Sequence, residues 1–224
     1  GLQVASYYQN LAIKRMEENE YNPLNLTNIP TSDRQAALAA HKQSRVKAPK
    51  HLAWLEGEDM EDYLFDMQII NEYALENRTM ILKKITEAMD GIILHRWDCV
   101  HNYIDSNKVL RKGSISAKAG QVVLVPMNMR DGLIMGIGKG NPDWNESAPH
   151  GAGRLYSRSV AKRNFSLSDF QDTMRDVQST TVGMDTMDEA PFAYKDMDEI
   201  IGATKETMEL IKIFKPVYNF KASE

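Results

Sequence analysis

The sequence has one cysteine and no long apolar run. Cys99 alone cannot form an internal disulfide, so we expect a structural thiol in a cytoplasmic protein. No stretch approaches the roughly 18 to 20 apolar residues that a membrane-spanning helix needs, and no secretory signal pattern opens the chain. With 42% hydrophobic residues among 224, the chain can bury a core. One large domain, or part of a bigger one, is therefore expected.

An excess of positive charge is also missing. The net charge is −4 and the isoelectric point is near 5.8, which argues against a general polyanion binder. The distribution is uneven, however, because residues 108–163 hold ten Lys or Arg and three Asp or Glu, giving +7 and leaving −11 elsewhere. This asymmetry indicates a phosphate-facing segment on an acidic scaffold. The alternative is a set of surface cations without a partner.

Hydrophobic periodicity predicts an α+β fold. Apolar residues recur at helical spacing over residues 2–19 and 59–90, and a short Ala-rich helix is expected from Ser32 or Asp33 to about Gln43. The β-type runs 121–125 and 133–137 predict short strands. Helices then surround a compact β-rich centre without regular βαβ alternation. Residues 1–56 are expected to form a helix and an irregular linker, and residues 57–224 the core.

Further helices are predicted after Gly151. One helix is expected over 151–165, and a second starts near Ser166 or Ser168, since either serine can cap it. Asp196 is expected to cap a last helix that runs to about Phe214. Short extended segments are predicted at 180–182 and 217–221.

His150 begins the run His-Gly-Ala-Gly-Arg. A neutral imidazole can attack the α-phosphate of a nucleotide and form a phosphoramidate. Glycines beside it let backbone N–H groups approach phosphate, and a helix starting there would attract anions. Arg154, Arg158 and Lys162 then follow at intervals of four, a spacing that suits RNA phosphates. The alternative is a loop histidine beside a solvated, charged helix.

Three other segments contain candidate ligands. His101-Asn102 follows Asp98 and Cys99, a neighbourhood that permits metal binding but lacks the paired spacing of a zinc motif. Arg111-Lys112-Gly113 lies at the edge of a predicted strand, where phosphate contacts or ordinary surface cations are both possible. Tyr194 precedes a predicted helix cap, and Lys221 lies near the end of the chain; neither is unusual by itself.

In this order the segments resemble the C-terminal half of the RtcB family of RNA ligases, most clearly from about Gly57 to Lys221. The resemblance implies an RtcB-like fold. It also implies a GTP- and Mn²⁺-dependent enzyme that joins an RNA 3′-phosphate or 2′,3′-cyclic phosphate to a 5′-hydroxyl. His150 would be the nucleophile that becomes guanylylated, and His101 would bind manganese. The implied nucleotide-binding residues are His101, Asn102, Pro126, Met127, Asn128, Met129, His150, Gly151, Ala152, Gly153, Tyr194 and Lys221. The implied RNA or phosphate contacts are Arg111, Lys112, Arg154 and Arg158.

The sequence departs from the family pattern in two places. The family has a Pro-Gly-Ser-Met-Gly loop around the nucleotide, whereas this chain has Pro-Met-Asn-Met-Arg-Asp-Gly over 126–132. The substitution of Met-Asn for Gly-Ser removes backbone freedom and a hydroxyl. The family's other metal ligands, an Asp, a Cys and two His, are expected upstream of residue 1. The chain is therefore interpreted as a fragment that does not ligate RNA alone. The first alternative is a noncatalytic nucleotide- or RNA-binding module. The second, which the sequence favours less, is a manganese-dependent phosphohydrolase.

Overall fold

The computed structural model describes residues 1–20, 27–44 and 49–221. The chain divides into two compact units, Gly1–Ile85 and Thr86–Glu224, which we describe separately. Part of the linker expected within residues 1–56 lies outside the described residues. No helix in the described parts is both long and apolar enough to cross a membrane.

The first unit is helical. It contains α1 (Leu2–Glu20), α2 (Arg34–Ser44), the 3₁₀ turn η1 (Lys50–Leu52) and most of α3 (Gly57–Ala88). These bounds confirm the three helices expected in this half. Periodicity located α1 and α3 to within a few residues, and a cap before an Ala-rich run located α2. The long helix predicted for the core therefore lies mainly in the first unit.

The contact between α1 and α3 explains the apolar stripe of α1. Tyr8, Ala12 and Met16 are buried at intervals of four, which places them on one helical face. The Tyr8 hydroxyl donates a 2.8 Å hydrogen bond to Asp66 of α3. Arg15 donates a 2.6 Å hydrogen bond to Asp59. Polar contacts thus flank the buried stripe and fix how the two helices pair.

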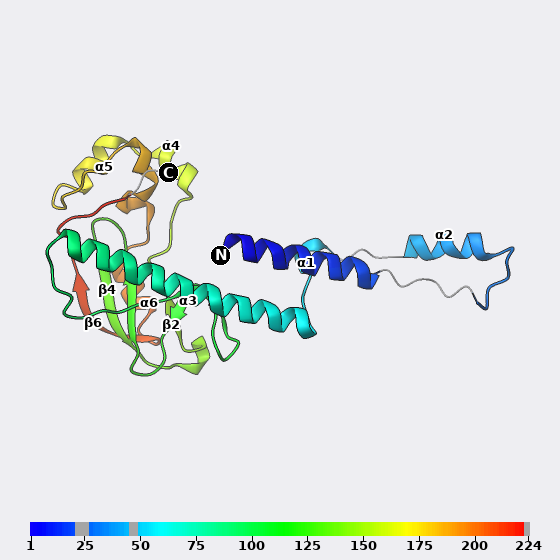
Figure 1. The fold of residues 1–224 in the computed structure, drawn as a ribbon. Helices are drawn as coiled ribbons and strands as arrows, with labels where there is room; N and C mark the ends of the chain where they lie inside the picture. The colour runs from blue at the N-terminus through cyan, green and yellow to red at the C-terminus, as the bar shows by residue number, and fades with distance from the viewer. Residues whose placement is uncertain (21–26, 45–48, 222–224) are drawn as a thin grey trace. The chain divides into compact units, whose positions relative to one another are not determined.

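Two three-stranded antiparallel sheets form the centre of the second unit (Figure 1). The first sheet has the order β1 (His101–Ile104), β2 (Leu110–Ser116), β5 (Ser147–Pro149). The second has the order β3 (Val122–Pro126), β4 (Leu133–Gly138), β6 (Met208–Phe214). The structure therefore confirms both predicted strands, as β3 and β4, and the α+β class.

Short helices and 3₁₀ turns complete the second unit. They are η2 (Pro142–Trp144), α4 (Arg158–Asn164), α5 (Leu167–Thr173), η3 (Met184–Glu189), η4 (Pro191–Ala193) and α6 (Met197–Ala203). One apolar core lies around the sheets and includes Val123, Ile134 and Ala152. A second lies beneath α5 and η3 and is centred on Phe170 and Met187. Both cores belong to this unit alone.

The helix predicted over 151–165 is wrong in its first half. The observed helix, α4, begins only at Arg158, where the Ser157 side chain accepts a hydrogen bond from the Val160 amide. Gly153 has a φ of +73°, which a right-handed helix does not allow. Arg154 instead forms a β-bridge with Tyr194. Pairing with a distant segment therefore overrides the local helical pattern.

The helix predicted from Asp196 to Phe214 is also wrong beyond Ala203. Asp196 does cap α6, by accepting a hydrogen bond from the Asp198 amide. The helix ends at Ala203, and residues 208–214 form β6, which pairs with β4. The apolar stripe that suggested one helix is thus divided between two elements. Of the predicted extended segments, 180–182 is not a strand, and 217–221 contributes only a bridge between Tyr218 and Gln178.

Candidate active site

The two histidines singled out from the sequence lie against each other. His101 starts β1 and His150 directly follows β5, and both strands pair with β2. Their rings are stacked, with centroids 5.1 Å apart and planes inclined by 20°. Segments almost fifty residues apart in sequence therefore present two imidazoles side by side.

Gly113 of β2 fixes the local geometry of this histidine pair. Its amide donates a 3.0 Å hydrogen bond to the Asn102 side-chain oxygen, and its carbonyl accepts one of 3.4 Å from the His150 amide. Its φ is +71°, and a Cβ added there would lie 3.8 Å from the His150 ring. The positive φ therefore favours glycine here, whereas a Cβ would meet the His150 ring at an ordinary van der Waals distance. The hydrogen bond from the Gly113 amide also fixes the side-chain oxygen of Asn102, a residue expected to bind nucleotide.

The loop at 126–132 is closed on itself. Met127 and Met129 are buried in the two apolar cores. The Asn128 side-chain oxygen accepts hydrogen bonds from the Arg130 and Asp131 amides, at 3.0 and 2.9 Å. In this structure the three side chains serve the core and the turn, and their expected role in binding nucleotide stays a prediction.

Pro126 links this loop to the segment after His150. Its carbonyl accepts a 3.1 Å hydrogen bond from the Ala152 amide. A Cβ at Gly151 would lie 3.2 Å from the same carbonyl oxygen, so the two backbones approach as closely as a glycine allows. Ala152 itself is buried. Gly151 and Ala152 thus pack directly on Pro126 through backbone contacts.

A second cluster surrounds the carboxylate of Glu189. Arg154 bonds one Glu189 oxygen, and the Tyr194 hydroxyl donates a 2.7 Å hydrogen bond to the other. The Lys221 ammonium lies 3.2 Å from that second oxygen. The Arg154 guanidinium also lies 4.7 Å from the centre of the Tyr194 ring. Three residues expected to bind nucleotide or RNA therefore meet at one acidic side chain.

The ionisation of this cluster follows from its contacts. Burial raises the pKa of Glu189, but the Tyr194 hydrogen bond and the charges of Lys221 and Arg154 outweigh it, so the pKa lies below its ordinary value. Burial, together with the bond to Glu189, raises the pKa of Tyr194 above its ordinary value. Glu189 is therefore a carboxylate and Tyr194 a neutral hydrogen-bond donor at neutral pH.

The arginine and lysine ladder is paired with acids. Arg158 and Lys162 lie 3.8 and 3.4 Å from the carboxylate of buried Asp188, while Arg154 pairs with Glu189. Arg154 precedes α4, so the expected single helical face is not formed. With Lys221, four cations meet two carboxylates, which leaves a local charge of +2. The cluster can still attract phosphate, though less strongly than free cations would.

Arg111, for which an RNA phosphate contact is predicted, makes internal contacts in this structure. Arg111 is 2% exposed and its guanidinium is fully engaged. It bonds Asp105 at 2.6 Å, the Ser147 hydroxyl at 2.9 Å and the Asn145 carbonyl at 3.1 Å. It therefore joins the turn after β1 to the start of β5. Its neighbour Lys112 is exposed and remains available for a phosphate contact.

The donor set for a metal is small. Within residues 1–20, 27–44 and 49–221, no three His, Cys, Asp or Glu side chains are grouped as a metal site requires. The Cys99 thiol is half-buried and contacts the Val122 carbonyl, and burial raises its pKa. The thiol is therefore protonated and structural, as its position in the sequence suggested.

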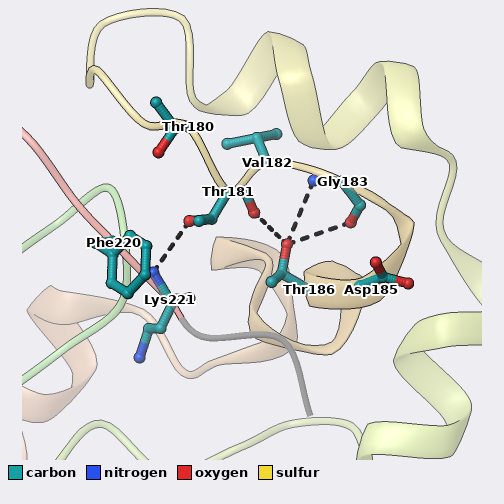
Figure 2. A pocket seen from close by; sticks show the side chains of 8 residues that line it. All are labelled: Thr180, Thr181, Val182, Gly183, Asp185, Thr186, Phe220 and Lys221. Atoms are coloured by element: carbon teal, nitrogen blue, oxygen red, sulfur yellow. Dashed lines mark hydrogen bonds between the residues drawn. The ribbon is translucent and has the colours of Figure 1, made fainter.

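A cavity of about 430 Å³ has Lys221, one of the donors to Glu189, in its wall (Figure 2). It is lined by Thr180, Thr181, Val182, Gly183, Asp185, Thr186, Phe220 and Lys221. The Lys221 amide donates a 3.0 Å hydrogen bond to the Thr181 hydroxyl, which ties the end of the chain to the cavity wall. Among the residues whose nucleotide-binding role the resemblance implies, Lys221 is the one that lines this cavity within the described part of the chain. Sequence reasoning missed both this wall and Glu189.

Comparison with known proteins agrees with the resemblance. The family described as tRNA-splicing ligase RtcB matches residues 1–222. The RNA-splicing ligase RtcB of Escherichia coli K12 is 28% identical over 97% of this chain and 52% of its own length. The tRNA-splicing ligase RtcB of Nanoarchaeum equitans is 27% identical over 72% of this chain and 42% of its own. The chain thus spans about half the length of the curated relatives it matches, and it belongs to the RtcB family.

Proposed function

We propose that this chain forms part of a GTP- and Mn²⁺-dependent RNA ligase that uses His150 as its nucleophile. The observation that supports this most is the stacked pair of His101 and His150 within a chain of the RtcB family. The relatives are named RNA-splicing or tRNA-splicing ligases, which supports RNA as the substrate class. The proposed RNA ends are a 3′-phosphate or 2′,3′-cyclic phosphate and a 5′-hydroxyl.

The proposed chemistry starts with a phosphoramidate. An imidazole nitrogen of His150 attacks the α-phosphate of GTP, a P–N bond forms, and pyrophosphate leaves as the P–O bond breaks. A 2′,3′-cyclic phosphate is first opened by water, which breaks the bond from phosphorus to the 2′-oxygen and gives a 3′-phosphate. GMP then passes from His150 to the RNA 3′-phosphate, and the 5′-hydroxyl attacks this activated end, gives up its proton and releases GMP. Exposed Lys112 and the net positive cluster around Glu189 would hold the phosphates. Tyr194 and Lys221 would contact the base.

Manganese would polarise the phosphates. His101 is the proposed ligand from this chain. The described residues contribute too few grouped donors to hold the ion by themselves, so manganese would need further ligands from outside them.

The test is covalent labelling of the full-length protein with radioactive GTP in the presence of Mn²⁺. His150→Ala should abolish the labelled band on a denaturing gel, because it removes the atom that bonds to phosphorus. Arg154→Ala should only weaken the label, by roughly tenfold to a hundredfold, since it removes a charge-assisted contact. His51→Ala, at an exposed histidine of η1, is the matched control and should label normally.

Two results would contradict the proposal. Undiminished labelling of the His150→Ala protein would mean that another residue is guanylylated. Binding of GTP without any adduct in the unsubstituted protein would favour the noncatalytic nucleotide-binding module instead.

A further inference from the structure

Glu189 joins three segments that are far apart in the sequence. Its donors are Arg154 after the glycine run, Tyr194 after η4 and Lys221 near the end of the chain. The carboxylate is the least exposed member of its pair with Lys221, at 18% against 40% for the lysine side chain. The flexible lysine is therefore held by a better-fixed acid.

The backbone around Glu189 explains why it is well fixed. Glu189 ends η3, and the Ala190 amide bonds back to the Met187 carbonyl. Met187 and Ala190 are fully buried in the second apolar core. Arg154 also donates a 2.5 Å hydrogen bond to the Asp188 carbonyl, which anchors the same turn. The backbone on both sides of Glu189 is thus held in place, by the packing of Met187 and Ala190 and by the hydrogen bond to the Asp188 carbonyl.

We propose that Glu189 is a positioning residue that holds Tyr194 and Lys221 in place to bind the base of the nucleotide. This inference rests on the proposed function, in which these two side chains contact the base. Both donors meet the same Glu189 oxygen, at 2.7 and 3.2 Å, so one acceptor fixes their separation. A base that contacts the tyrosine and the lysine together then meets a preformed pair.

The loss of the negative charge should act on the base rather than on the phosphates. Without it, Lys221 and Arg154 repel each other and the lysine regains its freedom to move. The tyrosine hydroxyl loses its charged acceptor, so the ring orientation is less restricted. The cluster meanwhile becomes more positive, which strengthens attraction to a polyphosphate. These opposite effects separate a positioning role from general destabilisation.

The experiment measures equilibrium binding of GTP, ATP and inorganic triphosphate to the full chain. Glu189→Gln should weaken GTP binding about tenfold, or ~1.4 kcal/mol, and reduce the preference for GTP over ATP. Its affinity for inorganic triphosphate should stay level or rise. Asp172→Asn is the matched control, because it removes one carboxylate from an exposed pair with Arg175. It should leave all three affinities and the nucleotide preference unchanged.

The outcomes distinguish this inference from the function on which it rests. If the unsubstituted chain binds GTP and Glu189→Gln binds it equally well with the same preference, the positioning role is overturned alone. An equal loss for GTP and triphosphate would also overturn it, since that pattern indicates general damage. If the unsubstituted chain binds no GTP, the positioning role fails for this chain, while the proposed function is decided separately by the labelling of the full-length protein.

A second pair of variants covers the case in which Glu189→Gln does not fold. Tyr194→Phe keeps the aromatic ring and removes only the hydroxyl, and Lys221→Met keeps a long side chain without its charge. Each substitution should reduce the preference for GTP over ATP severalfold. In Tyr194→Phe the affinity for inorganic triphosphate should change little. An unchanged preference in both proteins would refute the role of the cluster in holding the base.

Discussion

At the scale of single residues, burial decides which cations are available to a phosphate. Arg111 and Lys112 are adjacent in the sequence, yet Arg111 is buried against Asp105 and Lys112 is exposed. The alternation of a strand places neighbours on opposite faces, and the partner of Arg111 comes from the preceding turn. Only one of two similar side chains therefore remains for nucleic acid.

The buried ion pair of Arg111 and Asp105 is expected to contribute to the free energy of unfolding. Arg111→Met leaves the Asp105 carboxylate without its counter-charge in a poorly exposed site, so the free energy of unfolding should fall by about 3–5 kcal/mol. Urea denaturation measures this change. Arg175→Met, which breaks an exposed pair, should cost no more than about 0.5 kcal/mol. Similar losses in the two proteins would contradict the assignment.

The same pair predicts how stability depends on pH. Burial raises the pKa of Asp105, but the bond from Arg111 and the Val109 and Asn107 amides outweigh it, so the pKa lies below its ordinary value of 3.8. A lowered folded pKa contributes stability above pH 3.8 that is lost as the pH falls through the folded value. In Arg111→Met this acid-side loss should be smaller, as denaturation across that range would show.

At the scale of elements, the caps decide where the helices begin. The sequence left Ser166 and Ser168 as equal candidates for the cap before α5. The structure selects Ser166, whose hydroxyl accepts a 3.1 Å hydrogen bond from the Asp169 amide. Ser168 instead lies inside the first turn, where it contacts only the Ser166 hydroxyl. Cap geometry, rather than residue type, separates the two.

Substitution of these two serines tests the cap. Ser166→Ala should lower the free energy of unfolding by about 1 kcal/mol, because the Asp169 amide loses its acceptor. Ser168→Ala should change it by less than half as much, since alanine is a good helix former and no amide is left unpaired. Thermal denaturation followed by circular dichroism gives both values. A larger effect at Ser168 would mean that the helix starts elsewhere.

At the scale of the whole molecule, the candidate site belongs to the second unit. His101, His150, Glu189, Tyr194 and Lys221 all lie after Thr86, where the second unit begins. The two sheets and the two apolar cores lie in the same unit. The first unit has its own helix pairing between α1 and α3. The site is therefore expected to form without residues 1–85.

A fragment of residues 86–224 tests this independence. It should fold cooperatively, because its sheets and cores are complete within it. The ring protons of His101 and His150 should keep the same chemical shifts as in the full chain, since the stacked rings remain together. Nuclear magnetic resonance of both proteins makes the comparison. Shifts typical of free histidine in the fragment would show that the first unit is needed.

The sequence by itself determined the elements whose signal is local. Periodicity located α1 and α3, a cap before an Ala-rich run located α2, and the β-type runs located β3 and β4, because these signals depend only on neighbouring residues. It also singled out His101 and His150, which the structure places together. The family followed from short motifs whose order is preserved along the chain.

Only the tertiary structure decided which charged side chains are paired inside the protein and which segments form a strand or bridge in place of the predicted helix. The segment around Gly153 and the strand β6 were both predicted to be helical. The first forms a bridge between Arg154 and Tyr194, and the second pairs with β4, so both are extended. No motif in the sequence marks Glu189, whose donors come from positions 154, 194 and 221. Such contacts join residues separated by many others in the chain. Their free energy depends on distance and burial in three dimensions, which no local pattern encodes.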